Sequence, residues 1–164
     1  MLLNELENIG KYDYLLLDTG AGVSKDILAF ISASEELIVI TTPEPTSLTD
    51  AYSLIKVTDH FKLKTKVKIV VNRAFSKEEG EETFSKMLRA VSRFLKIEVE
   101  YLGYILDDRK LVQSVRAQKP FMLLYPNCDA AKNVENIAKK ISGDSSSSPE
   151  SVKGLFKKIL SAFS

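Results

Sequence analysis

The sequence predicts an α/β fold in which a doubly wound, mostly parallel sheet is flanked by helices. Short runs of aliphatic and β-branched residues are each followed by a polar turn and a longer segment of helical character. These runs show little polar alternation, which is typical of strands that are buried on both faces of a parallel sheet. The chain has 164 residues, 45% of them hydrophobic and 27% charged, which is the balance of about one globular domain.

Four of the runs are expected to be strands, at residues 12–17, 37–41, 67–71 and 99–105. Five helices are expected between and after them, at residues 24–33, 47–60, 78–95, 108–118 and 129–141. Ser24 and Asp108 stand at helix starts as capping residues, and His60 ends a helix. Pro120 closes the helix before it, and residues 121–125 are expected to add a short edge strand.

The loops that follow the four strands are the expected place for a ligand. In doubly wound sheets, ligands bind beyond the carboxyl ends of the strands. Those loops begin at Asp18, Thr42, Asn72 and Leu106, and all four should fall on one edge of the sheet.

The domain is expected to span residues 1–142, and the amino-acid composition changes after it. Residues 143–150 are rich in Ser and predict a flexible linker. Residues 151–164 predict an amphipathic helix, with one apolar stripe and lysines on the other side. The stripe consists of Val152, Leu155, Phe156, Ile159, Leu160 and Phe163, and the lysines are Lys153, Lys157 and Lys158. Binding in a membrane interface is the preferred interpretation, and docking on the chain's own domain is the alternative.

Charge and cysteine content exclude several classes of protein. The 23 basic and 22 acidic residues give a net charge of +1, so no overall field favours nucleic acid. One Cys and one His cannot form an internal disulfide or the usual four-ligand zinc site. The sequence shows no signal peptide and no run of about 20 apolar residues, so a cytoplasmic location is expected.

The segment DTGAG places an acid after a predicted buried strand. Asp18 is followed by Gly20 and Gly22, which allow close approach of a ligand. An acid at this position often holds Mg²⁺ through water near the β and γ phosphates of a nucleotide. The other interpretation is an Asp that only begins a loop.

Four motifs in order resemble a MinD/ParA-type P-loop ATPase, over its C-terminal two thirds. They are DTGAG, LIVITTPEPTSLTDAY, VVNRA, and YLGYILDD followed by VRAQKP. The resemblance covers about residues 10–142, and the terminal helix also matches. Within the group the sequence is most similar to FlhG, which controls flagellar number and placement, because Gly follows DT where MinD usually has Pro.

The resemblance implies a role for individual residues. Asp18 corresponds to the Walker B acid, which holds Mg²⁺ indirectly. Switch II corresponds to Thr19, Gly20, Ala21 and Gly22. Asn72 corresponds to the adenine-reading Asn, with Arg73 beside the base; as an isolated residue, Asn72 would more often be a turn former. The purine-lining loop corresponds to Ile105, Leu106 and Asp107, with Leu106 where the family usually has Pro. The loop at residues 41–47 corresponds to a dimer-facing loop, or else to a rigid turn with Thr46 or Ser47 as helix cap.

The glycine-rich P-loop with two lysines that the family carries is not found before Tyr12. This loop supplies most of the phosphate binding, so the chain alone is expected to bind ATP poorly and to hydrolyse hardly any. The sequence therefore predicts the C-terminal portion of such an ATPase, completed by a P-loop half or by self-association.

Three hypotheses follow for function. The first is a membrane-associated, ATP- and Mg²⁺-dependent dimerisation switch on the inner face of the cell membrane. Its partners would be an FlhF-type GTPase and flagellar switch proteins, or a division inhibitor. The second is a membrane-tethered interaction module without catalysis, and the third is an unrelated doubly wound domain that binds a nucleotide or flavin.

Overall fold

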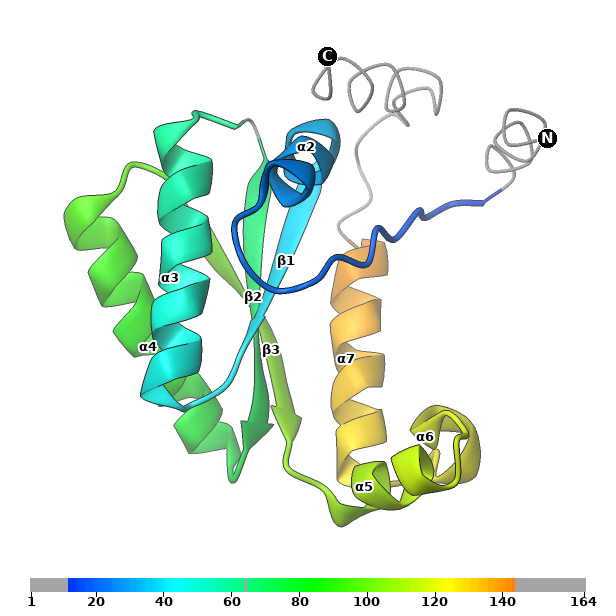
Figure 1. The fold of residues 1–164 in the computed structure, drawn as a ribbon. Helices are drawn as coiled ribbons and strands as arrows, with labels where there is room; N and C mark the ends of the chain where they lie inside the picture. The colour runs from blue at the N-terminus through cyan, green and yellow to red at the C-terminus, as the bar shows by residue number, and fades with distance from the viewer. Residues whose placement is uncertain (1–11, 64, 144–164) are drawn as a thin grey trace, which may run out of the picture.

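The computed structural model describes residues 12–63 and 65–143, which form a parallel sheet with helices on both faces (Figure 1). The strands are β1 (Glu36–Thr41), β2 (Lys66–Ala74) and β3 (Val99–Leu106). The helices are α2 (Lys25–Ala33), α3 (Pro45–His60), α4 (Lys77–Phe94), α5 (Arg109–Arg116), α6 (Phe121–Leu124) and α7 (Asp129–Gly143). The predicted α/β class and parallel sheet are confirmed.

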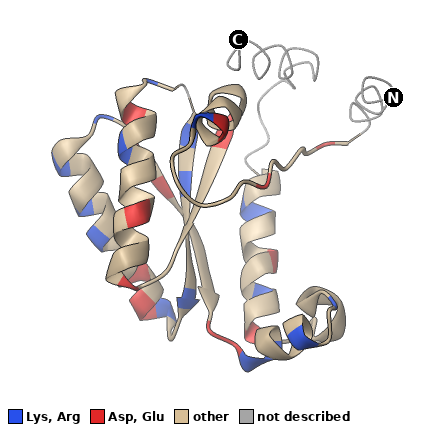
Figure 2. Cartoon of the chain, viewed as in Figure 1, with Lys and Arg blue, Asp and Glu red and all other residues tan. Residues whose placement is uncertain are grey.

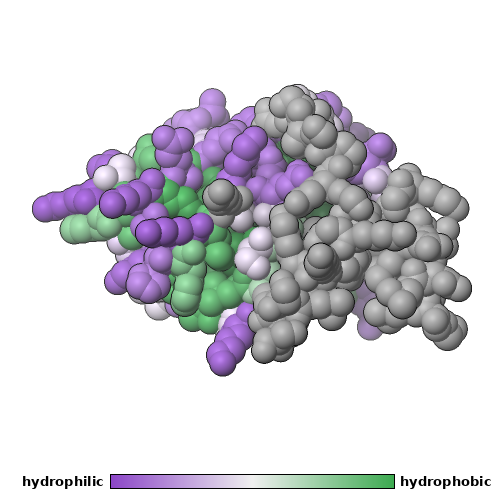
Figure 3. All heavy atoms as spheres, turned by 90° about the horizontal axis from the view of Figure 1, so that it is seen from above, coloured by the Kyte–Doolittle hydropathy of each residue, from purple (hydrophilic) through white to green (hydrophobic). Residues whose placement is uncertain are grey.

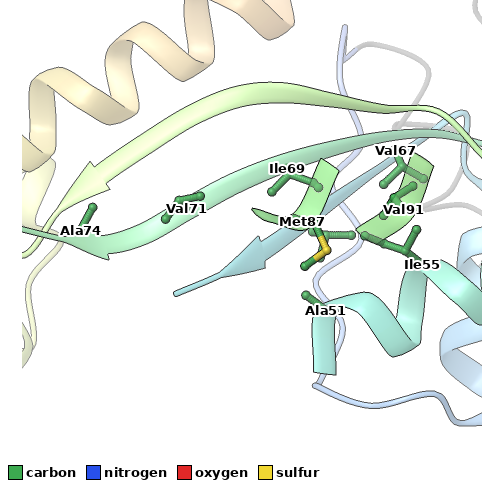
Figure 4. Close-up of a cluster of buried hydrophobic side chains, with 9 residues drawn as sticks. Ala51, Ile55, Val67, Ile69, Val71, Ala74, Met87 and Val91 are labelled. Carbon is green, nitrogen blue, oxygen red and sulfur yellow. The ribbon is translucent and has the colours of Figure 1, made fainter. Parts of the chain in front are cut away.

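The three strands lie in the order β1-β2-β3, all parallel, with β2 in the centre. Successive residues of β2 point to opposite faces, and both faces are covered. On one face Val67, Ile69 and Val71 pack against α3 and α4, as Figure 4 shows. On the other face Val70 packs with Ile137 of α7. Burial on both faces explains why the strand sequences lack alternation.

The predicted strand at residues 12–17 is wrong. These residues belong to none of the three strands of the described sheet, and Tyr12 and Leu16 are 73% and 79% exposed. A strand exists only as part of a ladder, and within the described residues β1 pairs with β2 alone. The apolar run is therefore present without the neighbour that would make it a strand.

The predicted edge strand at residues 121–125 is also wrong, because α6 occupies this place. The N–H groups of Leu123 and Leu124 donate to the Pro120 carbonyl at 3.0 and 3.2 Å, which closes one helical turn. The sequence of α6, FMLL, contains no β-branched residue, so local preference does not oppose the turn. Pro120 thus precedes α6, while α5 already ends at Arg116.

Other boundaries differ from the expectation by one to three residues. Ser24 and Asp108 cap α2 and α5 as predicted, and α3 ends at His60. However, α3 begins at Pro45, so neither Thr46 nor Ser47 is its N-cap. Gly143 ends α7, and the remainder of the predicted linker, together with the amphipathic helix at 151–164, lies outside the described residues.

Apolar side chains remain at the surface where the strands begin. Figure 3 views this end of the molecule and shows apolar groups among hydrophilic ones. A hollow of about 400 Å³ lies there, between the end of α4 and the start of β3, lined by residues that include Leu95 and Ile97. No described helix is long and apolar enough to cross a membrane.

Gly80 sets how closely α4 approaches β3. A Cβ at this position would lie 2.8 Å from Tyr104 Cβ and 3.1 Å from the Tyr101 hydroxyl. Alanine in a helix usually gains about 1 kcal/mol over glycine, whereas overpacking costs about 1–3 kcal/mol. Because the 2.8 Å contact is with a Cβ atom, which cannot swing away, we expect the upper part of this cost, about 2–3 kcal/mol. Gly80→Ala should then lower the free energy of unfolding in urea by about 1–2 kcal/mol. Gly143→Ala, where a Cβ meets open space, is the control and should not destabilise. A Gly80→Ala protein as stable as wild type would contradict this tight packing.

Candidate functional site

Two polar residues end the central strand. Asn72 and Arg73 are among the last three residues of β2, which ends at Ala74. The strand therefore includes residues that the sequence placed in a loop. The Oδ1 atom of Asn72 accepts the Arg73 N–H at 2.9 Å, and Arg73 has a φ of 57°. This left-handed conformation is uncommon for a residue other than glycine. Within the described residues, the Nδ2 hydrogens of Asn72 remain as donors toward a ligand.

The loop after β3 is held next to the end of β2. The Asp107 N–H donates to the Ala74 carbonyl at 2.9 Å, and the Leu106 N–H donates to Asn133 Oδ1 of α7 at 3.1 Å. Strands β2 and β3 thus remain hydrogen-bonded beyond the register shift between Val71 and Ala74. The backbone of the predicted purine-lining residues is therefore fixed relative to Asn72 and Arg73.

The Asp108 carboxylate accepts hydrogen bonds at the N-termini of two helices, α5 and α7. Its carboxylate accepts the Lys110 N–H at 2.8 Å, which caps α5. This bond, with further hydrogen bonds from the Cys128 thiol and the Ala130 N–H, lowers the pKa of Asp108 from its usual value. The carboxylate therefore stays ionised and holds the start of α7 beside that of α5.

A pocket of about 380 Å³ opens between these elements. Its lining comes from the end of β2, the loop after β3 and one side of α5, namely Asn72, Arg73, Asp107, Asp108, Leu111, Val112, Val115 and Arg116. Figure 2 shows basic residues on α5 and at this end of the sheet, with acidic residues in the connecting loop. The pocket combines an amide, charged groups of both signs and an apolar wall, which suits a flat heterocycle with polar edges.

The loop between β1 and α3 reaches the same region. Ser47 Oγ accepts the Thr42 N–H at 2.9 Å and lies 3.1 Å from Thr41 Oγ1, so the predicted capping hydroxyl stabilises the loop. Glu44 Oε1 lies 3.9 Å from Arg73 Nη1, and both side chains are exposed. An exposed pair of this kind contributes at most about 1 kcal/mol, but it places the loop beside the pocket.

Asp18 is not brought to this pocket. Asp18 and the residues Thr19, Gly20, Ala21 and Gly22 lie on the exposed segment that leads to α2. In Figure 1 this segment is well separated from α5 and α6. A Cβ at Gly20 or Gly22 would meet nothing within 4 Å. Of the four loops expected on one edge, the structure thus gathers the three that follow β1, β2 and β3.

Sequence reasoning missed several residues of this site. Asn133 is distant in sequence from the loop that it supports, and no local pattern marks it. Val112, Val115 and Arg116 were part of a predicted helix, but its period alone does not show which face lines a pocket. The signal available in the sequence was the presence of apolar residues in the helix that directly follows the predicted purine-lining loop.

Comparison with known proteins places these features in a family. Residues 1–142 match the ParA family, described as NUBPL iron-transfer P-loop NTPase. The antiactivator FleN of Pseudomonas aeruginosa is 32% identical over 129 residues, which cover 79% of this chain and 46% of FleN. The flagellum site-determining protein YlxH of Helicobacter pylori is 30% identical over 158 residues, which cover 93% of this chain and 53% of YlxH. The chain thus spans about half the length of these curated relatives.

Solved structures show the same fold. The MinD cell division protein of Aquifex aeolicus superposes with a TM-score of 0.68 at 23% identity, covering 90% of this chain and 61% of that one. The septum site-determining protein MinD of Pyrococcus horikoshii, solved with Mg-ADP, gives 0.63 at 22% identity, covering 85% of this chain and 55% of that one. Together with the family match, this fold shows that the chain belongs to the ParA/MinD family of P-loop NTPases.

Proposed function

We propose that this chain is the C-terminal portion of a FlhG/MinD-like spatial regulator, a nucleotide-dependent dimerisation switch that positions flagella or the division site. The observation that carries the proposal is the pocket at the ends of β2 and β3, where Asn72 and Arg73 face the loop before α5. Similarity to a flagellum site-determining protein and to MinD proteins supports the regulatory role.

The pocket would take the base of ATP. The Asn72 amide offers donor and acceptor groups side by side, the pattern that pairs with the edge of adenine. The end of β3 at Ile105 and Leu106, with Asp107 directly after it, would line the ring from the next strand. The backbone bonds from Asp107 to Ala74 and from Leu106 to Asn133 hold it there. The base subsite would therefore be rigid before nucleotide arrives.

Mg²⁺ would bind only together with the phosphates. Proteins usually hold Mg²⁺ by one or two carboxylates plus substrate phosphates, so the Asp18 carboxylate fits as one member of such a set. The described residues contain no group of three acidic, His or Cys side chains that would form a complete metal site. Asp18 would act through water, with Thr19 to Gly22 beside the γ phosphate.

A P-loop half, or a second copy of the chain, would complete the site. The edge of β1 that faces away from β2 is unpaired within the described residues, and Ile40 of β1 is exposed. Unpaired edges and apolar side chains favour addition of a further strand. A P-loop half docked there would supply the phosphate-binding lysines and contact the segment that carries Asp18.

The C-terminal segment would attach the assembly to the inner face of the cell membrane. Its apolar stripe and three lysines suit an anionic lipid surface. One short helix binds weakly, and two in a dimer bind far better through avidity. An FlhF-type GTPase and flagellar switch proteins, or a division inhibitor, would be the partners of the membrane-bound state.

The second candidate is a membrane-tethered interaction module without catalysis. The exposed position of Asp18 favours it, because within the described residues that acid is not among those that line the pocket. Association with a P-loop half distinguishes the two candidates, since only the first requires it.

Asn72→Ala tests the base subsite. In the chain combined with its P-loop half, we expect ATP affinity to fall by about 1–3 kcal/mol and discrimination against GTP to decrease, because a buried base edge loses its amide partner. Titration calorimetry with ATP and GTP measures both. The control is Asn127→Ala, an exposed Asn outside the pocket, which should leave both affinities unchanged. ATP and GTP affinities that are both unchanged in the Asn72→Ala protein would return this residue to a turn-forming role.

A further inference from the structure

We propose that the end of the domain at which the strands begin rests on an anionic lipid surface, beside the amphipathic helix predicted at residues 151–164. The inference rests on the proposed function, in which that helix attaches the protein to the membrane. It adds a second contact, which belongs to the domain itself. The two contacts together would fix which end of the domain faces the lipid.

Two phenylalanine rings are exposed to solvent at this end. Phe61 directly follows α3 and is 57% exposed, and Phe94 ends α4 and is 68% exposed. The loops that carry them are joined, because both carboxylate oxygens of Asp59 lie 3.3 Å from the Lys96 nitrogen and accept its N–H. Single exposed apolar residues are common, whereas apolar groups gathered on one surface mark an interaction site.

An apolar hollow adjoins the loop that follows Phe94. It measures about 400 Å³ and lies between the end of α4 and the start of β3, on the end of the molecule that Figure 3 views. Its apolar lining consists of Leu88, Val91, Leu95, Ile97 and Val99. Acyl chains are flexible and can fill an irregular hollow of this kind without a partner shaped to fit it. The hollow therefore extends the apolar surface that a lipid would cover.

Basic side chains lie beside the two rings. The loops at residues 60–63 and 93–97 contain Lys62, Arg93 and Lys96 and no acidic residue. All three basic residues are exposed, and Arg93 Cζ lies 5.2 Å from the centroid of the Phe94 ring. Phenylalanine and leucine side chains bordered by lysine and arginine are typical of surfaces that lie in the interface of an anionic membrane. The charge complementarity is local, in keeping with the chain's net charge of +1.

The direction of α7 favours lipid over a partner protein as the occupant. Asn133 of α7 bonds the Leu106 N–H at the end of β3. Further along the helix, Lys140 Nζ donates to the Leu102 carbonyl at 2.8 Å. Helix α7 therefore runs against β3 and ends where the strands begin (Figure 1). The chain continues from that point through residues 144–150, which can span about 24 Å at most, to the predicted membrane helix.

Contact at this end would leave the pocket facing away from the lipid. The nine residues of β2 separate its two ends by about 30 Å. Asn72 and the loop after β3 lie at the far end of the strands from Phe61 and Phe94. Nucleotide would therefore reach the pocket while the protein is bound to the membrane.

The first experiment uses a fluorescent reporter. The chain contains no tryptophan, so a single introduced tryptophan reports its own surroundings. In the full chain, we expect the emission of Phe94→Trp to shift to shorter wavelength on addition of vesicles of phosphatidylglycerol and phosphatidylcholine in equal amounts. Brominated lipid should quench it. Phe75→Trp, at an exposed phenylalanine directly after β2, is the matched control and should keep the emission of a tryptophan in water.

The second experiment measures the contribution to affinity. The pair Phe61→Ala and Phe94→Ala should weaken sedimentation of the full chain with the same vesicles by about tenfold, because two apolar rings no longer enter the interface. The pair Phe75→Ala and Leu123→Ala removes two exposed apolar side chains at the other end of the sheet and should leave binding unchanged. The end of the domain by itself should bind too weakly to sediment, since the predicted helix supplies most of the affinity.

Two results would overturn the inference while leaving the proposed function in place. One is a chain that binds vesicles through Phe156 and Ile159, although Phe94→Trp keeps its aqueous emission and the Phe61 and Phe94 alanine pair binds as wild type does. The other is Phe94→Trp emission that is already at short wavelength without vesicles and becomes aqueous when Phe156 and Ile159 are replaced by Glu. That result would show that the chain's own C-terminal helix covers this surface. Protein that ignores vesicles both alone and with its P-loop half would contradict the proposed membrane attachment as well.

Discussion

The double substitution Phe156→Glu and Ile159→Glu is expected to abolish sedimentation of the chain with anionic liposomes. Both positions lie in the middle of the apolar stripe predicted for residues 151–164. Charges there oppose burial in the membrane interface, whereas in the wild type three lysines each add roughly 1 kcal/mol near an acidic leaflet. Wild-type binding should be weak, should fall with salt, and should rise when the protein dimerises.

A matched control separates the apolar face from net charge. Ser161→Glu with Ser164→Glu adds the same two charges on the opposite side of the predicted helix, and should only weaken binding as added salt does. Circular dichroism should show the fold of residues 12–143 unchanged in both variants, because the Ser-rich linker is expected to uncouple the helix. Unfolding of the domain by the first pair would show that this helix belongs to the core. Wild-type protein that ignores liposomes both alone and with its P-loop half would refute membrane binding.

The purified chain is expected to show no appreciable ATP turnover by itself. Phosphoryl transfer depends on backbone amides and lysine around the phosphates, and these come from the P-loop. Asp18 lies on an exposed segment and is not among the residues that line the pocket. A coupled assay of phosphate release measures the rate. Steady turnover that Asp18→Asn abolishes would show that the chain contains a phosphate site of its own.

The sequence predicted those parts of the fold that depend on burial. The runs that became β1, β2 and β3 are apolar on both sides because helices cover both faces, so their composition alone indicated parallel strands. Ser24 and Asp108 were recognised as caps because capping is a local hydrogen bond between neighbours in sequence.

The failures share a physical cause, which is dependence on a partner that local sequence does not specify. Residues 12–17 have the composition of a buried strand, but no described strand lies beside them. Residues 121–125 have weak preferences, and one turn begun by Pro120 decides their conformation.

The residues of the candidate site likewise include some that the sequence predicted and some that it did not. Asn72, Arg73, Ile105, Leu106 and Asp107 were assigned by resemblance. The structure places Asn72, Arg73 and Asp107 in one pocket, whereas Ile105 and Leu106 end β3 and are not among its lining residues. Asn133 supports that loop through a bond between residues 27 positions apart. The outward direction of Val112 and Val115 depends on how α5 packs, which its short sequence does not decide.

The most direct test of the account is ATP binding by an equimolar mixture of this chain and the P-loop half of the same protein, measured by titration calorimetry. We predict that the two halves associate and that the mixture binds Mg-ATP, with affinity lost on Asn72→Ala, while this chain alone binds ATP only poorly. Two well-folded halves that neither associate nor bind ATP would contradict the account and favour a non-catalytic module.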